Sequence, residues 1–447
     1  MAIDVHACYQ SIVTELQQLQ QPGAWKTIPD AFPGLISAGP VGSIVINGAI
    51  EHEIRAIADW MLNQQPGAKK QHTLREWRAT VRQAFGPALA GIDLDEPAAL
   101  SGVTLKTLVD EAVRTKPKII PLMFTSIGCR LFHEPLTSSL TIGPVLFESK
   151  ADWLSRAEQI GRISRKSRDR LRRAFGGRPL RKLKNARQDL SDRQAVDVLA
   201  GAQMVCTIET RDLAPELSEV RAITGARLAQ AAIALLWTQP STVLGGFHLS
   251  VDHGSRRIAT VPYIPGRALI GGRRVVGTPA GKPNDLESAL SGARDLFQMA
   301  GRMIECWTSA TAFDRAPPIM RSLAQGLCFF WEACRDDNDL MAIVKFTAVL
   351  EALAPPGMEA GIKKLIRARL GVKDGVAFVG ERDLDQVTKW LYRVARSRTL
   401  HGTNPEILHD WTELRAVAEQ LTHHCLVQCM IWLDKNPVAT KTEELLV

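Results

Sequence analysis

The sequence predicts an α+β fold that is mainly helical, in which a mixed α/β amino-terminal part precedes an all-α bundle. From Asp285 onward, apolar residues recur at helical spacing in one segment after another, without strand-like alternation. Strand-like runs rich in β-branched residues lie only before that point. Pro- and Gly-rich breaks such as Gln65-Pro66-Gly67 separate the elements. We therefore expect three regions, at residues 1–115, 116–284 and 285–437.

The first two regions combine helices with short strands. In residues 1–115 the pattern predicts a short strand within 35–48 and three helices, at His6–Gln20, Ala49–Gln64 and Leu74–Phe85. In residues 116–284 it predicts strands within 116–132, 139–147 and 202–210, and helices at Asp152–Ile163 and Glu216–Trp237. A hairpin turning at His253-Gly254-Ser255 and an exposed Gly- and Arg-rich loop at 266–285 complete the second region.

The third region is expected to be a bundle of six helices. Asn284-Asp285 is a typical helix start, Pro355-Pro356-Gly357 is a helix stop, and Gly371 ends another helix. The predicted helices are Glu287–Phe313, Pro317–Cys334, Asp339–Ala354, Met358–Leu370, Arg382–Leu400 and Trp411–Leu433.

Composition excludes several classes of protein. The chain has 447 residues, of which 45% are hydrophobic and 23% charged, as in ordinary globular proteins of two or three domains. Its eight cysteines form no CxxC pair, and we expect them reduced in the cytoplasm. No signal peptide and no apolar run of about 20 residues is evident, so we expect no membrane partner. We expect no metal and no cofactor.

The positive charge is concentrated in one segment. Between Arg162 and Arg187 there are twelve Lys or Arg residues and one acid, Asp169, whereas the whole chain has a net charge of +8. Such a segment attracts polyanions, of which nucleic acid is the usual one. The alternative is a solvated surface that contributes only solubility. The candidate RNA-binding residues are Arg165, Lys166, Arg168, Arg170, Arg172, Arg173, Arg181 and Lys182.

One pair of residues suits RNA chemistry. In LYRVARSRTLHGTNP, Gly402 and Pro405 end the helix, which places Arg396 in its last turns and His401 at its end. A ribose 2′-hydroxyl attacks the neighbouring phosphate without a metal if a histidine moves the proton and an arginine faces the developing charge. Residues five apart on a regular helix point about 140° apart. The two side chains therefore converge only if the helix ends between them or a second subunit contributes.

The surroundings of this pair resemble a known superfamily. An Arg-x4-His spacing by itself is expected about once by chance in such a chain. Here, however, Tyr392, Arg396, Ser397, His401 and Gly402 resemble the RxxxxH signature of HEPN proteins, in particular the ApeA-like branch, although Tyr392 lies one place further from the arginine. Upstream, AIVKFTAVLEALAPPG, which contains Glu351, and GIKKLIRARLGV are similar to the family's preceding helices. The resemblance covers about residues 339–433.

The resemblance implies a metal-independent endoribonuclease that acts as a homodimer in a toxin system or in bacterial defence against phage, with RNA as substrate and an unidentified trigger. It implies that Arg396 binds the scissile phosphate, that His401 moves the proton, and that Ser397 orients one or both of them or contacts the phosphate. Arg393 and Arg398 would hold neighbouring phosphates, and Tyr392 and Gly402 would be structural. We expect Glu351 to form an ion pair with an arginine of the motif helix. HEPN toxins silenced by a nucleotidyltransferase carry a tyrosine where this chain has Thr403, which argues against that form of regulation.

Three alternatives remain. Arg396 and His401 could only complement the dipole at a helix end, and the bundle could be a catalytically silent binding or dimerisation module acting as sensor or scaffold. A DNA-binding regulator is a further alternative, although no recognition helix is evident. His423, His424, Cys425 and Cys429 could bind a metal, but we interpret them as core cysteines with one exposed histidine, because no second ligand cluster accompanies them.

Overall fold

The computed structural model describes residues 3–21, 34–115, 119–252 and 283–447, with only the backbone of 283–286, and the backbone of short strands between 257 and 275. The fold is mainly helical with small sheets, as the sequence predicts. The chain divides into two compact units, Met1–Pro121 with Arg211–Glu219, and Leu122–Thr210 with Val220–Val447. The expected boundaries at 115/116 and 284/285 stay predictions.

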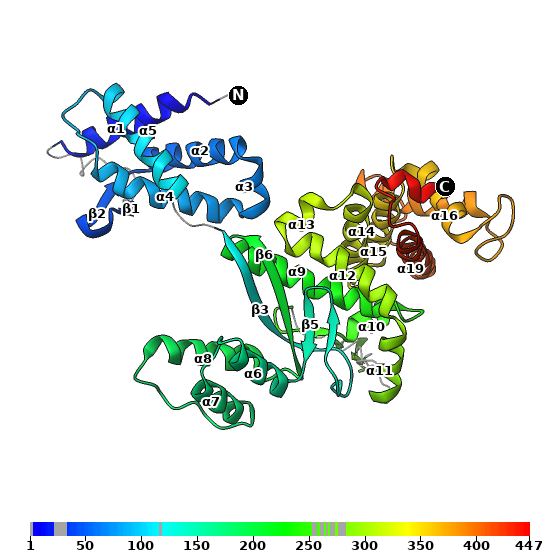
Figure 1. Ribbon diagram of the computed structural model, residues 1–447. Helices are drawn as coiled ribbons and strands as arrows, with labels where there is room; N and C mark the ends of the chain where they lie inside the picture. The colour runs from blue at the N-terminus through cyan, green and yellow to red at the C-terminus, as the bar shows by residue number, and fades with distance from the viewer. Residues whose placement is uncertain are drawn as a thin grey trace. The chain divides into compact units, whose positions relative to one another are not determined.

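The first unit is a helical cluster around its own apolar core (Figure 1). Its helices are α1 (Val5–Leu19), α2 (Gly48–Gln64), α3 (Pro66–Gln71), α4 (Leu74–Ala90) and α5 (Ala98–Thr115). The predicted short strand is an antiparallel hairpin of β1 (Gly34–Ser37) and β2 (Ser43–Ile46), joined by the 3₁₀ turn η2 (Gly39–Val41). The hairpin packs on α4 so closely that Gly86 has no space for a Cβ atom, which would lie 1.9 Å from the carbonyl oxygen of Ser37.

The second unit is organised around a five-stranded sheet of order β4-β5-β6-β3-β7. Its strands are β3 (Ile120–Arg130), β4 (Leu140–Ile142), β5 (Val145–Glu148), β6 (Met204–Leu213) and β7 (His248–Leu249). The segment predicted as one strand within 139–147 is a tight hairpin, because Gly143 turns the chain with φ +55°. The expected turn at His253-Gly254-Ser255 lies outside the described residues, which nearby include the strands β8 (Arg257–Ala259), β9 (Tyr263–Ile264), β10 (Arg267–Ala268) and β11 (Arg273–Val275).

Three helices interrupt the sheet between β5 and β6. They are α6 (Lys150–Gln159), α7 (Arg165–Phe175) and α8 (Ala186–Leu199), and they lie together in Figure 1. A small core that includes Trp153, Leu171 and Leu199 holds them together and joins them to Val205 of β6. We call residues 150–199 the basic lobe.

The rest of the second unit is helical. After α9 (Pro215–Ala234) and α10 (Pro240–Gly246), the helix predicted at Glu287–Phe313 is three helices, α11 (Pro283–Gly292), α12 (Arg294–Thr308) and α13 (Ala310–Arg315). Gly301 of α12 contacts Gly143 of the β4–β5 hairpin so closely that a Cβ atom on either residue would clash.

The remaining helices agree closely with the sequence prediction. They are α14 (Pro318–Cys334), α15 (Asp339–Leu353), α16 (Met358–Leu370), α17 (Leu384–Lys389), the π-helix η3 (Trp390–Ser397), α18 (Arg398–Leu400), α19 (Thr412–Lys435) and the 3₁₀ helix η4 (Thr442–Leu446). Helix α15 contacts α14, α16, α19 and η3, so it is central to the bundle. One apolar core runs from Ile127 in the sheet to Leu445 near the carboxy terminus.

Among the described residues, no helix is by itself both long and apolar enough to cross a membrane; α15 and α16 meet that standard only as a pair bent by 73°.

Candidate active site

The predicted motif lies on a helix that changes its winding. Helix α17 begins with a capping box, in which the Asp383 side chain accepts from the Gln386 N–H and the Gln386 side chain accepts from the Asp383 N–H. From Trp390 to Ser397 the helix has π geometry, and it returns to α geometry at Arg398. Segments of π-helix are rare in proteins, and those that occur are often found at functional sites. The apolar periodicity predicts a continuous helix at this point and contains no signal for the π segment.

Arg396 is held on two sides. Its Nε donates to Oε2 of Glu351 on α15 at 3.1 Å, and its Nη2 lies 3.0 Å from the same oxygen in an ion pair. Its guanidinium carbon lies 5.3 Å from the centre of the Tyr392 ring, which favours a cation–π contact. The ion pair that the sequence predicted for Glu351 is therefore present. The Arg396 side chain is 24% exposed, and no partner of Nη1 is seen among the described residues, so this nitrogen remains free for a ligand.

His401 lies at the end of the helix and is exposed. Its N–H donates to the carbonyl of Ser397 at 3.0 Å, and Gly402 then adopts φ +66°, a conformation that glycine accepts most readily. In the described part of the chain, the imidazole has no hydrogen bond, ion pair or ring contact. Its ring is therefore accessible to a partner molecule.

Arg396 and His401 do not meet within one copy of the chain. The bond from His401 to Ser397 spans one α-helical turn, and the helix ends only after Leu400. Five residues of α-helix separate side-chain directions by about 140°, and no contact between the two side chains is seen within the described ranges. The helix ends at Leu400, directly before His401, but this end brings the two side chains into no contact within one copy.

The other predicted residues of the motif have separate environments. Arg393 pairs with Glu359 at 2.5 Å, and Glu359 is also paired with Lys363 at 2.8 Å. Lys363 and Arg393 lower the pKa of Glu359. Ser397 is half-buried, and its hydroxyl forms no hydrogen bond with Arg396 or His401. Arg398 is exposed and has no ion pair with any described residue. The Glu359–Lys363 pair was not anticipated from the sequence.

The basic segment contains cations of two kinds. Arg170 is 7% exposed and lies between Asp189 and Asp192, at 2.5 and 2.6 Å, so the prediction that it binds RNA directly is wrong. Arg168 is half-buried and is paired with Glu158 and Asp169, which leaves it little capacity for a phosphate. The remaining predicted residues, Arg165, Lys166, Arg172, Arg173, Arg181 and Lys182, are exposed.

His423, Cys425 and Cys429 of α19 are part of the core, whereas His424 is exposed. The Nε2 atom of buried His423 lies 2.8 Å from the carbonyl oxygen of Leu235 at the end of α9. Cys425 and Cys429 are buried, and burial raises the pKa of both thiols, that of Cys429 to about 12. Within the ranges the structure describes, no group of three or more His, Cys, Asp or Glu residues is placed to hold a metal ion.

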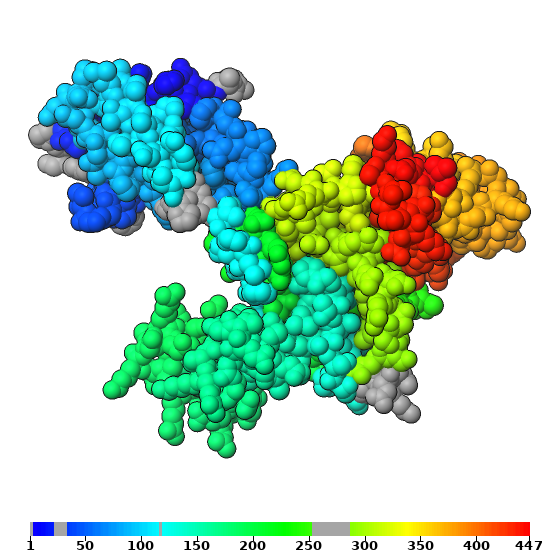
Figure 2. Space-filling model, viewed as in Figure 1, coloured from blue at the N-terminus to red at the C-terminus, as the bar shows by residue number. Residues whose placement is uncertain are grey.

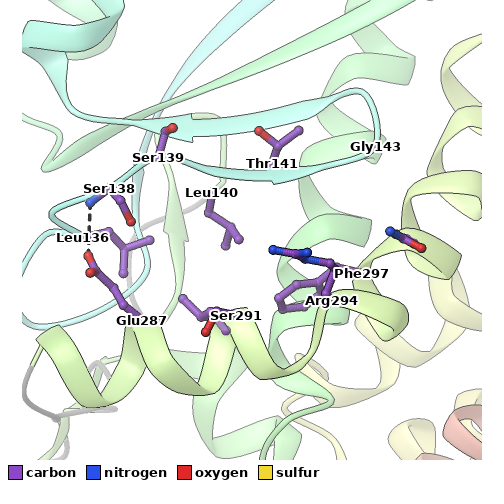
Figure 3. Close-up of a pocket in the computed structure, with 12 residues that line it drawn as sticks. Leu136, Ser138, Ser139, Leu140, Thr141, Gly143, Glu287, Ser291, Arg294 and Phe297 are labelled. Carbon is purple, nitrogen blue, oxygen red and sulfur yellow. Dashed lines mark hydrogen bonds between the residues drawn. The ribbon is translucent and has the colours of Figure 1, made fainter.

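A cavity of about 280 Å³ lies between the β4–β5 hairpin and helices α11 and α12 (Figure 3). Glu287 fastens the loop before β4 to α11, because its carboxylate accepts from the N–H groups of Thr137 and Ser138 at 2.8 and 3.1 Å. Bonds from Thr137 and Ser138 lower the pKa of Glu287. The Arg294 guanidinium extends into the space beside Leu140 (Figure 3). None of the residues predicted as functional lines this cavity.

Comparison of the chain with models of protein families gives no match, and neither curated proteins nor solved structures give one.

Proposed function

We propose that the chain is a metal-independent endoribonuclease of the HEPN type, which cleaves RNA through Arg396 and His401 in the cytoplasm of a bacterium, in phage defence or as a toxin. The observation that carries this proposal is the contrast between the two side chains. Arg396 is oriented by Glu351 and Tyr392 with Nη1 free, whereas the imidazole of His401 is exposed at the end of the same helix. One is a fixed cation and the other an accessible proton carrier.

The two residues suffice for transfer of the phosphate to the ribose. His401 takes the proton of the 2′-hydroxyl, the 2′-oxygen forms a bond to phosphorus, and the bond from phosphorus to the 5′-oxygen breaks. The 5′-oxygen leaves with a proton supplied by an imidazolium or by water. The guanidinium of Arg396 faces the negative charge that grows on the phosphorane oxygens. The products are a 2′,3′-cyclic phosphate and a 5′-hydroxyl end.

A twofold dimer would complete the site. Arg396 of one copy would then face the same phosphate as His401 of the other. The segment next to His401 supports this arrangement because it exposes apolar side chains, with Leu400 52%, Ile407 69% and Leu408 97% exposed. A contiguous patch formed by these side chains would be typical of an interface.

The test compares purified wild type with His401→Ala and Arg396→Ala on a mixed RNA pool, with the ends mapped chemically. We expect the wild type to produce cyclic phosphates in the presence of a chelator, and both variants to lose at least a hundredfold in rate, in the range typical of acid–base and charge-stabilising groups. His52→Ala is the matched control, since His52 is also exposed but lies in the other unit. Full cleavage by the His401→Ala variant would exclude the proposed mechanism.

A silent scaffold is the second candidate, and the ion pair of Arg396 with Glu351 is the observation in its favour, because such a pair also stabilises a bundle without chemistry. Expression in bacteria separates the two. Growth arrest by the wild type but not by the Arg396→Ala variant favours the enzyme. A purified dimer that binds RNA but never cleaves it favours the scaffold.

A further inference from the structure

The basic lobe carries an excess of positive charge that its own acids do not offset at the surface. Residues 150–199 contain fifteen Lys or Arg and six Asp or Glu. Glu158 and Asp169 pair with Arg168, and Asp192 with Arg170. The remaining engaged acids are Asp189, which pairs with Arg170 and Arg193, and Asp152, which accepts from Ser149 at the start of α6. Five of the six acids are therefore engaged within the lobe or at its edge.

Nine cations between Arg165 and Arg187 remain exposed and form no ion pair with any residue in the described ranges. They share one stretch, which comprises α7 and the segment that leads to α8: Arg165, Lys166, Arg172, Arg173, Arg178, Arg181, Lys182, Lys184 and Arg187. Figure 2 shows the long side chains of this stretch, in green, extending outward. The lobe therefore presents its free charge in a continuous part of the chain.

Helix α7 separates its two faces cleanly. Its buried positions are Ser167, Arg170, Leu171 and Ala174, which recur every three or four residues. Arg165 and Arg172 are seven residues, or about 10.5 Å, apart along the opposite side. Because the apolar face of α7 is buried in the core of the lobe, it has no apolar stripe with which to enter a membrane.

A buried ion cluster holds the following segment in place. Nη2 of Arg170 donates to the carbonyl of Arg181 at 2.5 Å, and Asp189 accepts from the N–H of Leu183 at 3.2 Å. The arginines Arg193 and Arg170, with the Leu183 N–H, lower the pKa of Asp189 to about 2, so it stays ionised at neutral pH. Arg170 is thus a positioning residue for the cations of residues 178–187.

We propose that the basic lobe binds the phosphate backbone of RNA through the outer face of α7 and residues 178–187, without reading the base sequence. Six of the nine free cations are arginines, whose planar fork fits phosphate oxygens. The two aromatic residues of the lobe, Trp153 and Phe175, pack against each other in its core, so no exposed ring is available to stack on bases. The choice of RNA over DNA rests on the proposed ribonuclease function.

The experiment measures binding of full-length His401→Ala protein, which should not cut its ligand, to two unrelated 30-nucleotide RNAs by fluorescence anisotropy between 50 and 300 mM salt. We expect both RNAs to bind with similar affinity and steep salt dependence. The triple variant Arg165→Gln, Arg172→Gln, Arg173→Gln should weaken binding at least tenfold at about 0.1 M salt and reduce the slope of log K against log salt by about two to three, since each lost phosphate contact removes about 0.7–0.9.

The matched control neutralises three exposed cations outside the lobe, Arg315, Lys373 and Lys435. Equal loss in this control, or an unchanged slope in the lobe triple, overturns the proposal, as does lobe-dependent binding to anionic phospholipid vesicles without binding to RNA. Strong dependence on RNA sequence overturns the backbone-only part. If the wild type binds RNA through the lobe but leaves it intact, the nuclease proposal fails and the lobe proposal stands.

Discussion

Arg396 forms an ion pair with Glu351, in which Nε donates to Oε2 and Nη2 lies 3.0 Å from the same oxygen, although 45 positions separate the two residues in the chain. This contact joins the π segment of the motif helix to α15, the central helix of the bundle. The ion pair orients the guanidinium and engages only the side that carries Nε and Nη2. The remaining edge can face an anion, so the pair holds the arginine in position without occupying it fully.

Replacing Glu351 with Gln should reduce the single-turnover rate of RNA cleavage by roughly ten- to hundredfold, because a misplaced charged group loses much of its effect on the transition state. RNA affinity should change little, since we propose that the basic lobe supplies the binding contacts. Stability to urea should fall by only about 1 kcal/mol, because the pair is partly exposed. Glu413→Gln, which removes the exposed partner of Arg382, is the control and should leave the rate unaltered. A Glu351→Gln variant as fast as the wild type, or faster, would show that the carboxylate does not position the arginine for catalysis.

Replacing Leu408 with Glu should dissociate the proposed dimer and abolish the proposed cleavage without unfolding the chain. Leu408 is 97% exposed, so the substitution should alter the stability of the single copy by less than about 0.5 kcal/mol. In a twofold dimer it would place one buried, unpaired glutamate from each copy at the interface, which suffices to separate the copies. Sedimentation velocity measures the change. Val438→Glu is the control, because Val438 is also exposed, at 89%, but lies beyond α19. Persistence of the dimer in the Leu408→Glu variant would place the interface elsewhere.

His423 should make stability depend on pH just below neutrality. Burial lowers the pKa of its imidazole, so between the ordinary value near 6.5 and the lowered value the unfolded chain binds a proton that the folded chain does not. Stability should therefore be complete above about pH 6.5 and decrease as the pH falls, with a slope of at most about 1.4 kcal/mol per pH unit from this one group. Urea unfolding of wild type and His423→Gln between pH 5 and 8 measures the difference. Parallel curves for the two proteins would contradict the assignment.

Much of the bundle could be predicted from local patterns. The predicted helices Pro317–Cys334, Asp339–Ala354 and Met358–Leu370 agree with α14, α15 and α16 to within one residue at each end. The end of the motif helix at Leu400 was also predictable, because Gly402 accepts a positive φ and Pro405 cannot continue a helix. The helix boundaries within Glu287–Phe313 could not be predicted, because the apolar periodicity continues across the breaks at Ala293 and Ser309.

Which arginines of the basic segment are buried and which are exposed could not be predicted. Sequence alone treats Arg170 and Arg172 alike, yet one is buried in an ion cluster and the other is exposed. The available signal was the pair Asp189 and Asp192, which lie three residues apart and so share a face of the helix that follows. Their partner could be identified only once α7 and α8 were packed together.

The amino-acid sequence by itself determined the helical character of the bundle, the end of the motif helix and the local excess of positive charge, because periodicity, caps and charge counts act over a few neighbouring residues. The tertiary structure alone decided that Arg396 meets Glu351, that Arg170 is withdrawn from the surface, and that His401 stays free. These outcomes depend on which helices pack together and at what angle, and that is set by the whole apolar core rather than by any local segment.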